Sequence, residues 1–275
     1  MSENIDNRVV AGFGDEWSRF DQSELSDAEL RAMFDSYFSI FPWSKLPEDP
    51  VGFDLGCGSG RWAKLVAPRV GTLHLIDPSP EALNVAKRNL GRALNCEFHN
   101  AGVEEIPLAD ESCDFGYSLG VLHHIPDTEA GLRACVAKLK KGAPFLLYLY
   151  YRFDNRPAWF WALWSASDIG RQFVSRMPHP ARFAFSQALA AGIYFPLARG
   201  SKLLERFGMD VTHVPLSQYR DYSFYTMRTD ALDRFGTRLE KRFTRVEMQE
   251  MMQNVGLENI TFAETAFWTA VGYKK

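Results

Sequence analysis

Short apolar runs recur along the chain after Val51, and segments with a helical pattern separate them. Apolar residues at helical spacing mark three such segments, at about 60–68, 80–92 and 127–139. Strands that alternate with helices form a parallel sheet, because each helix carries the chain back to the same end of the sheet. The pattern therefore predicts an α/β fold with a doubly wound, mostly parallel sheet. The predicted strands lie in VGFDL, TLHLI, CEFH, CDFGYSL and PFLLYLYY.

Several predicted helices carry sequence signals at their ends. Residues 24–41 have apolar side chains at roughly helical spacing and end before Pro42, which predicts an N-terminal helix. Ser79 is a candidate N-cap for the helix that starts at Pro80. Near the C-terminus, TRVEMQEMMQNVG predicts a helix that ends at Gly256. The segments ENITFAE and AFWTAVGYKK follow, with only a residue or two of turn between them, and they predict an antiparallel hairpin that closes the sheet.

The alternation of strands and helices stops after Tyr151. Residues 152–243 instead contain helical pieces broken by prolines, and we interpret them as an insertion into the sheet domain. These prolines are Pro157, Pro178, Pro180, Pro196 and Pro215. The predicted parts of the chain are an N-terminal helical segment at 1–50, a sheet domain at 51–151 and 244–275, and a helical insertion at 152–243.

Composition narrows the class of protein. The chain has 275 residues, of which 46% are hydrophobic, so it can bury one large core or two small ones. Its formal net charge of -3 argues against a surface devoted to nucleic acid. The N-terminus lacks a signal-peptide pattern, and no uninterrupted apolar stretch is long enough to span a bilayer. We therefore expect a cytoplasmic protein.

The cysteine and histidine spacings give no sign of a disulfide framework or a metal site. The cysteines are far apart in the sequence and form no CxxC pair, and no histidine lies beside them at zinc-site spacing. We expect reduced, buried thiols and no bound metal. The cysteines are Cys57, Cys96, Cys113 and Cys135.

The stretch FDLGCGSGRW places three glycines, Gly56, Gly58 and Gly60, at alternate positions after the first predicted strand. A glycine-rich turn between a strand and a helix lets a ligand approach the backbone closely, and the helix N-terminus offers unpaired N–H groups. The spacing GxGxG differs from the GxGxxG of dinucleotide folds, because Arg61 stands in the sixth position. Asp54 at the strand end favours a ligand with positive charge over a diphosphate.

Four stretches within residues 51–151 form a set: DLGCGSG, LIDPSPEAL, VEEIPLADESCDFGYSLGVLHHIPD and LKKGAPFLLYLYY. Their order and spacing resemble the class I S-adenosylmethionine-dependent methyltransferases. The similarity is greatest to the methyltransferase type 11 group, which includes ubiquinone and menaquinone C-methyltransferases. The resemblance implies S-adenosylmethionine as the cofactor. It also implies a seven-stranded sheet of order 3-2-1-4-5-7-6, in which the last strand is reversed.

The resemblance further implies which residues bind the cofactor. Asp77, at the end of the second strand, matches the acidic position that accepts both ribose hydroxyls, and the alternative is that it caps the next helix. Gly102 stands where the family often has an acidic residue near the adenine. The backbone of Val103 is then the main contact, or Glu104 substitutes. The implied cofactor residues are Asp54, Gly56, Gly58, Gly60, Asp77, Val103, Leu119 and Trp17.

Two N-terminal aromatic residues are candidates for closing the cofactor site. Phe13 and Trp17 in FGDEWSRF stand four apart, hence on one face if this segment is helical. The segment resembles one that folds across the cofactor in some of these enzymes. An aromatic ring there would attract the sulfonium and exclude water. The alternative is that both rings belong to an ordinary core.

Methyl transfer from a sulfonium depends mainly on alignment, because the cofactor already carries an activated methyl group. Alignment can lower the barrier by about 7–11 kcal/mol, whereas a general base adds roughly 10²- to 10⁴-fold in rate. By family analogy, His123 or His124 is the candidate base for a hydroxyl acceptor, and the alternative is that they pack or bind the backbone. Tyr151 and Arg152, just beyond the fifth strand, are candidate acceptor contacts.

The insertion is both cationic and apolar. Between Arg152 and Arg206 there are eight basic and three acidic residues, and AWFWALW and ALAAGIYFPLA lie in the same region. We interpret it as a lid over the acceptor site. Three descriptions of its surface stay open: a face that touches an anionic membrane, a pocket for a large apolar or anionic acceptor, and a helical cap with a solvated cationic face. Tyr219 and Tyr222 are candidate acceptor contacts.

These features predict an S-adenosylmethionine-dependent methyltransferase that acts on a small-molecule, glycan or lipid-linked acceptor, with O-methylation slightly preferred. An NAD(P)-dependent oxidoreductase is the first alternative, which the GxGxG spacing and the lack of a Tyr-x-x-x-Lys pair disfavour. A non-catalytic cofactor-binding module is the second alternative. The candidate acceptor contacts in the insertion disfavour it. No nucleic-acid partner is expected, and the acceptor and oligomeric state are left open.

Overall fold

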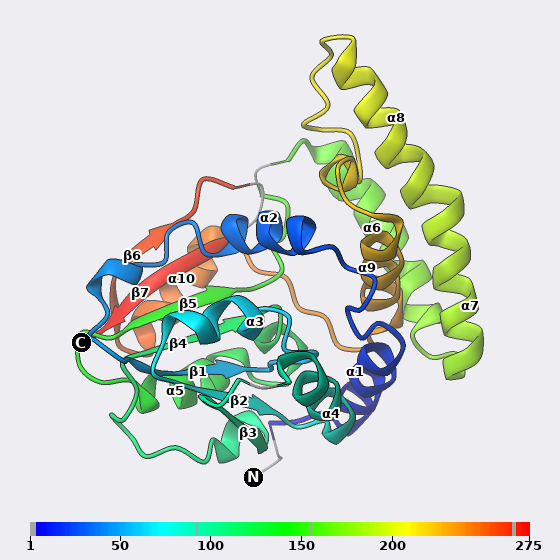
Figure 1. The fold of residues 1–275 in the computed structure, drawn as a ribbon. Helices are drawn as coiled ribbons and strands as arrows, with labels where there is room; N and C mark the ends of the chain where they lie inside the picture. Colours follow the sequence, from blue (N-terminus) through cyan, green and yellow to red (C-terminus); the bar gives the residue numbers. More distant parts are fainter. Residues whose placement is uncertain (1–3, 92, 155, 266–267) are drawn as a thin grey trace. The chain divides into compact units, whose positions relative to one another are not determined.

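The computed structural model describes residues 4–91, 93–154, 156–265 and 268–275 (Figure 1). The chain divides into two compact units. The first comprises Met1–Gln22, Leu30–Arg152 and Leu239–Lys275, and the second comprises Ser23–Glu29 and Phe153–Arg238. Among the described residues, no helix has the length and apolar character needed to cross a membrane.

A seven-stranded sheet forms the centre of the first unit (Figure 1). Its order is β3-β2-β1-β4-β5-β7-β6, and its pairs are parallel except where β7 joins β5 and β6. The order and the reversed last strand confirm the predicted fold class. The strands are β1 (Val51–Leu55), β2 (Thr72–Asp77), β3 (Cys96–Asn100), β4 (Phe115–Leu119), β5 (Pro144–Tyr148), β6 (Leu257–Phe262) and β7 (Thr269–Lys274).

The central strands are buried on both faces, which explains their continuous apolar runs. Phe53, Leu75 and Phe115 have no exposed surface. Leu132 of α5 and Met248 of α10 pack into the same core as Phe53. The helices outside the insertion are α1 (Asn7–Arg19), α2 (Asp27–Tyr37), α3 (Ala63–Val66), α4 (Pro80–Leu90), α5 (Thr128–Lys138) and α10 (Arg245–Asn254).

The predicted start of α4 is confirmed, whereas α2 is shorter than predicted. The Ser79 hydroxyl accepts a hydrogen bond from the backbone N–H of Ala82, as an N-cap does. The predicted helix at 24–41 ends at Tyr37. Phe38 and Trp43 lie beyond it, and their rings stack with 5.7 Å between centroids. The chain therefore leaves the helix so that these side chains can join an aromatic cluster.

The C-terminal helix and hairpin follow the prediction except at the turn. A capping box starts α10, in which Thr244 and Glu247 each bind the other's backbone N–H. Strands β6 and β7 pair antiparallel, as predicted. Their last bond runs from Ala263 N–H to Thr269 O, so the connection is longer than the predicted residue or two. Residues 266–267 of that connection lie outside the described residues.

The second unit is built mainly from helices of the insertion. Pro157 and Pro178 stand at the N-caps of α6 and α7, before any helical hydrogen bond is lost. The predicted break at Pro196 is wrong, because the helix continues from α7 through a π-helical turn into α8. That wider turn separates the proline ring from the preceding carbonyls. The elements are α6 (Ala158–Val174), α7 (His179–Leu189), the π-helical turn (Ala190–Tyr194), α8 (Phe195–Arg206) and α9 (Phe224–Gly236).

Two buried arginines hold the second unit together at the end of α9. Arg171 and Arg182 are each 6% exposed. Arg171 donates to the carbonyl of Thr237 at 2.9 Å, and Arg182 donates to the carbonyl of Gly236 at 3.0 Å. Arg171 also pairs with Asp168 at 2.6 Å. These guanidinium groups satisfy carbonyls that the last turn of a helix leaves free.

Candidate active site

The glycine turn after β1 strongly favours glycine at three positions. Gly56 and Gly58 have φ angles of +74° and +54°, which side chains rarely adopt. A Cβ atom on Gly56 would lie 2.4 Å from a methyl carbon of Val121, which is too close for any real contact. Gly60 also has a positive φ, of +73°. Backbone conformation and crowding therefore both explain the spacing of the three glycines.

Trp17 of α1 lies against this turn. A Cβ atom on Gly58 would fall 2.9 Å from the indole ring. The guanidinium of Arg61 lies over the same ring, 5.8 Å from its centre. Trp17 was predicted from its sequence position. Gly14, which lets α1 approach Ser79 at the start of α4, was missed, because no local pattern marks a close approach between helices.

Asp77 connects the glycine turn to the end of β2. One carboxylate oxygen accepts the N–H of Gly58 and the other accepts the N–H of Ser79, both at 2.9 Å. Burial raises the pKa of Asp77 to about 6, although these two hydrogen bonds oppose the rise. The N-cap of α4 is Ser79, so Asp77 is not itself the helix cap. Each oxygen keeps a further lone pair that can accept a ligand hydroxyl.

Asp54 lies deeper than Asp77, at the end of β1. Its side chain is 1% exposed. Burial raises its pKa to about 8; an interaction with Tyr117 opposes the rise, and the nearby Asp77 adds to it. At neutral pH the free protein therefore holds most of its Asp54 as the uncharged acid. A cation bound beside it would favour the charged form instead.

The remaining predicted cofactor positions lie at the ends of the neighbouring segments. Val103 starts a short 3-10 turn and is buried, whereas Glu104 is exposed. Leu119 ends β4 and is 9% exposed. Gly102 has an ordinary φ of -81°, and a Cβ atom there would meet only Ile5, at 3.5 Å. Nothing in the local backbone thus requires glycine at position 102.

The two histidines lie in the 3-10 turn Leu122–His124 that follows β4, and they differ in their surroundings. His123 is fully buried, and its ring lies 3.9 Å from that of Tyr150 between centroids. Burial lowers its pKa well below the ordinary value, and His124 and Arg242 lower it further. Neither ring nitrogen of His123 has a hydrogen-bond partner among the described residues.

His124 is oriented by the backbone. Its Nδ1 lies 2.7 Å from the carbonyl oxygen of Leu239, so Nδ1 carries the proton and Nε2 carries the lone pair in the neutral ring. Phe13 of α1 packs against the His124 ring at 5.0 Å between centroids. Tyr150 was not predicted as a site residue. It lies two residues after Tyr148, the last residue of β5, so the alternation of a strand indicates that both side chains point to the same face.

The predicted acceptor contacts fall in both units. In the first, Arg152 pairs with Glu247 of α10 at 2.8 Å, and the Tyr151 ring packs edge-on against Trp268. In the second, Tyr219 and Tyr222 lie 6.2 Å apart between ring centroids. Tyr151 and Arg152 thus belong to the first unit, and Tyr219 and Tyr222 belong to the second.

Part of the sheet unit is similar to a known protein family. Residues 53–147 match a family whose description is "Methyltransferase domain". The match begins in β1 and ends in β5, and it includes the glycine turn and Asp77. The central part of the sheet unit is therefore similar to a methyltransferase domain.

Curated relatives name a more particular activity. A ubiquinone biosynthesis O-methyltransferase of Xanthomonas axonopodis pv. citri is 28% identical over 134 residues, which cover 47% of this chain and 53% of the relative. One of the same name from Pseudomonas fluorescens is 26% identical, over 60% of this chain and 69% of the relative. The chain thus matches about half the length of the first of these relatives.

Solved structures share the fold at low sequence identity. Human N-acetylserotonin methyltransferase, in complex with S-adenosylmethionine, has a TM-score of 0.55 and 15% identity, with 97% of this chain and 57% of that chain covered. A SAM-dependent methyltransferase from Thermotoga maritima has a TM-score of 0.51 and 16% identity, with 96% and 100% covered. At 15% and 16% identity, these structures show that the chain shares the fold of S-adenosylmethionine-dependent methyltransferases.

Proposed function

We propose that this protein transfers a methyl group from S-adenosylmethionine to a hydroxyl group of a small, largely apolar acceptor. The observation that carries the proposal is the contact between the glycine turn and Asp77, whose carboxylate accepts the N–H of Gly58 at 2.9 Å. This contact fixes a carboxylate beside a turn whose three glycines leave the backbone open to a ligand. When bound, the cofactor supplies the activated methyl group.

Each cofactor residue has a role that fits its surroundings. Asp77 would accept the ribose hydroxyls, because its oxygens keep free lone pairs. Asp54 would face the cationic part of the cofactor, which offsets the cost of its burial. Trp17, placed over Gly58, would cover the bound cofactor and exclude water. The N–H of Val103 would bind the adenine, since Gly102 has no side chain that could do so.

For the proton of the acceptor hydroxyl, His124 is the better supported base of the two histidines. Its Nδ1 contact with Leu239 directs the lone pair to Nε2, which is the orientation that a base needs. His123 is stacked on Tyr150, and its low pKa makes it a weak proton acceptor. We assign His123 to positioning the turn that carries His124.

The named relatives, O-methyltransferases of ubiquinone biosynthesis, support oxygen as the methylated atom. We infer that a phenol with an apolar tail is the acceptor class. The test mixes the purified chain, isotopically labelled S-adenosylmethionine and a series of phenols whose apolar tails grow in length. We expect an O-methylated product and faster turnover with longer tails. Cofactor binding without transfer to any acceptor would instead favour a non-catalytic module, and binding of NADH alone would favour an oxidoreductase.

Variants separate the roles of the site residues. Asp77→Ala should weaken S-adenosylhomocysteine binding by about 1–3 kcal/mol, as the loss of a charge-assisted hydrogen bond does. His124→Ala should slow turnover by roughly 10²-fold or more and leave cofactor affinity nearly unchanged. Unchanged affinity in the first variant, or wild-type turnover in the second, would remove that residue from the proposed site.

The second unit supports peripheral contact with an anionic membrane as the source of such an acceptor. Its helices expose large apolar side chains, among them Ile169 (73%), Phe173 (70%) and Phe207 (77%). Basic residues such as Arg176 and Arg206 are exposed in the same unit. Apolar side chains among basic ones match the interface of an anionic bilayer.

Sedimentation with vesicles tests this contact. Vesicles with anionic lipid should bind the chain, and vesicles of neutral lipid should bind it less. The variant Phe173→Ser/Phe207→Ser should lose binding. Val246→Ser, which changes an equally exposed apolar residue of the first unit, is the control and should retain it. Equal binding by all three proteins would contradict the assignment of the surface.

A further inference from the structure

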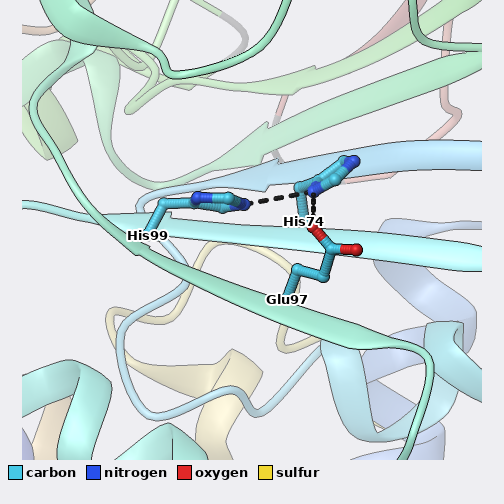
Figure 2. Close-up of side chains that lie close together, drawn as sticks. All are labelled: His74, Glu97 and His99. Carbon is cyan, nitrogen blue, oxygen red and sulfur yellow. Dashed lines mark hydrogen bonds and ion pairs between the residues drawn. The ribbon is translucent and has the colours of Figure 1, made fainter.

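Two histidines and a glutamate converge on the outer strands of the sheet (Figure 2). His74 belongs to β2, and Glu97 and His99 belong to the edge strand β3. The Nδ1 atom of His74 lies 3.1 Å from Nε2 of His99 and 3.3 Å from a carboxylate oxygen of Glu97. One potential ligand atom from each side chain lies within 4.8 Å of the others.

The strand register creates this cluster. In the parallel pair β2–β3, His74 is opposite Glu97, and His99 lies two residues further along the same strand. Residues directly opposite and residues two apart share one face of a sheet. Phe98, between them, points to the other face, where Lys87 of α4 covers its ring at 5.7 Å. The three side chains therefore share the face of β3 that α4 does not cover.

Two of the three separations match those between ligands of one small cation. Zinc binds imidazole nitrogen at about 2.0–2.1 Å and carboxylate oxygen at about 2.0–2.2 Å, so tetrahedral ligands lie about 3.3 Å apart. The two separations at His74, 3.1 and 3.3 Å, agree with this value. Without a cation, the Nδ1 atom of His74 carries one proton at most and must serve both contacts. A cation would satisfy the lone pairs of all three groups together.

We propose that His74, Glu97 and His99 bind one zinc ion. Two imidazoles and one carboxylate are a donor set that zinc accepts readily. Glu97 is exposed, so water can complete the coordination from the solvent side. The ion would tie the edge strand β3 to β2. The site departs from the expectation of no metal, because its ligands come together through strand pairing and not through a spacing along the chain.

The test measures zinc binding by the full chain in competition with a chromophoric chelator. We expect one zinc ion per chain. His74→Ala and His99→Ala should each weaken binding at least tenfold, and Glu97→Gln should weaken it by a smaller factor. Cobalt added in place of zinc should give the intense visible absorption of a four-coordinate ion, which His99→Ala should lose.

Cys96→Ser is the matched control, because Cys96 neighbours Glu97 but points to the other face of the strand. It should keep wild-type zinc affinity. Glu97→Gln tests the site in a protein that should still fold. The Glu97 side chain is 59% exposed, so its replacement by an isosteric amide disturbs no core. The proposal would be overturned if His99→Ala bound zinc with wild-type affinity. It would also be overturned if Cys96→Ser lost zinc binding while Glu97→Gln retained it.

Discussion

The two units bury charged groups in opposite ways. In the first, burial raises the pKa of Asp54 to about 8 and that of Asp77 to about 6. In the second, burial also acts to raise the pKa of Asp168, but hydrogen bonds from Arg171 and Gln172 outweigh it and lower the pKa to about 2.

The contrast is consistent with the proposed binding site in the first unit and a structural ion pair in the second. A buried carboxylate with a guanidinium beside it is already satisfied, and removing one partner leaves the other unpaired. The raised pKa values of Asp54 and Asp77 mark carboxyl groups whose surroundings supply too little positive charge. A cofactor that carries a sulfonium and an ammonium would supply it.

Removing the guanidinium of Arg171 should have the largest effect on stability. Arg171→Ala would leave the partly buried Asp168 without its closest partner and the carbonyl of Thr237 without its donor, so we expect the free energy of unfolding to fall by about 3 kcal/mol. Denaturant unfolding followed by circular dichroism measures the loss. Arg176→Ala removes an exposed arginine that follows the same helix, and its effect should stay within about 0.5 kcal/mol. Equal stabilities would show that the buried pair is dispensable.

A side chain at position 58 should disable the cofactor site with less effect on the fold. Gly58→Ala adds strain of about 1–3 kcal/mol at its positive φ and pushes against Trp17. We expect S-adenosylhomocysteine affinity to fall roughly 100-fold, or about 2.7 kcal/mol. Gly142→Ala is the control, because Gly142 has a φ of +77° and open space around its Cβ position. It should lose stability and keep affinity.

The sequence predicts what depends on local pattern and misses what depends on packing between distant segments. The apolar runs predicted the strands, because buried strands require apolar residues. The glycine spacing predicted the turn at Gly58, because its backbone conformation favours glycine. The contact of Tyr150 with His123 and the convergence on His74 depend on which strands are neighbours and in what register. The helix continues through Pro196 because a π-helical turn precedes it, and no residue pattern predicts such a turn.

Low pH should weaken cofactor binding, because the carboxyl groups of Asp54 and Asp77 have raised pKa values. The pKa of Asp54 in the free protein is above its ordinary value, so Asp54 reduces stability progressively as pH rises from about 4 to about 8. Asp77 does the same up to about pH 6. Bound S-adenosylmethionine should reverse this trend, because its positive charges favour both ionised forms.

Affinity for S-adenosylmethionine should therefore rise by up to about tenfold per pH unit between pH 6 and 8 and level off above pH 8. Calorimetry in two buffers of different ionisation enthalpy should detect proton release on binding at pH 7. Asp54→Asn removes the titrating group and should flatten the profile. A flat profile in the unaltered protein would show that the cofactor's charge does not reach Asp54.

The smallest expected effect is a gain in affinity at the adenine end of the site. The family resemblance implies that Gly102 stands at a position suited to an acidic residue, and its backbone accepts a side chain, because the nearest described atom to its Cβ position belongs to Ile5, at 3.5 Å. Gly102→Asp should give the adenine amino group a carboxylate partner and tighten S-adenosylhomocysteine binding about fivefold, or about 1 kcal/mol. Gly102→Ala adds the same Cβ atom without the carboxylate and should leave affinity unchanged. If both variants bind alike, the adenine does not lie beside position 102. A carboxylate at this position would then not contribute to cofactor binding, unlike those proposed at Asp54 and Asp77.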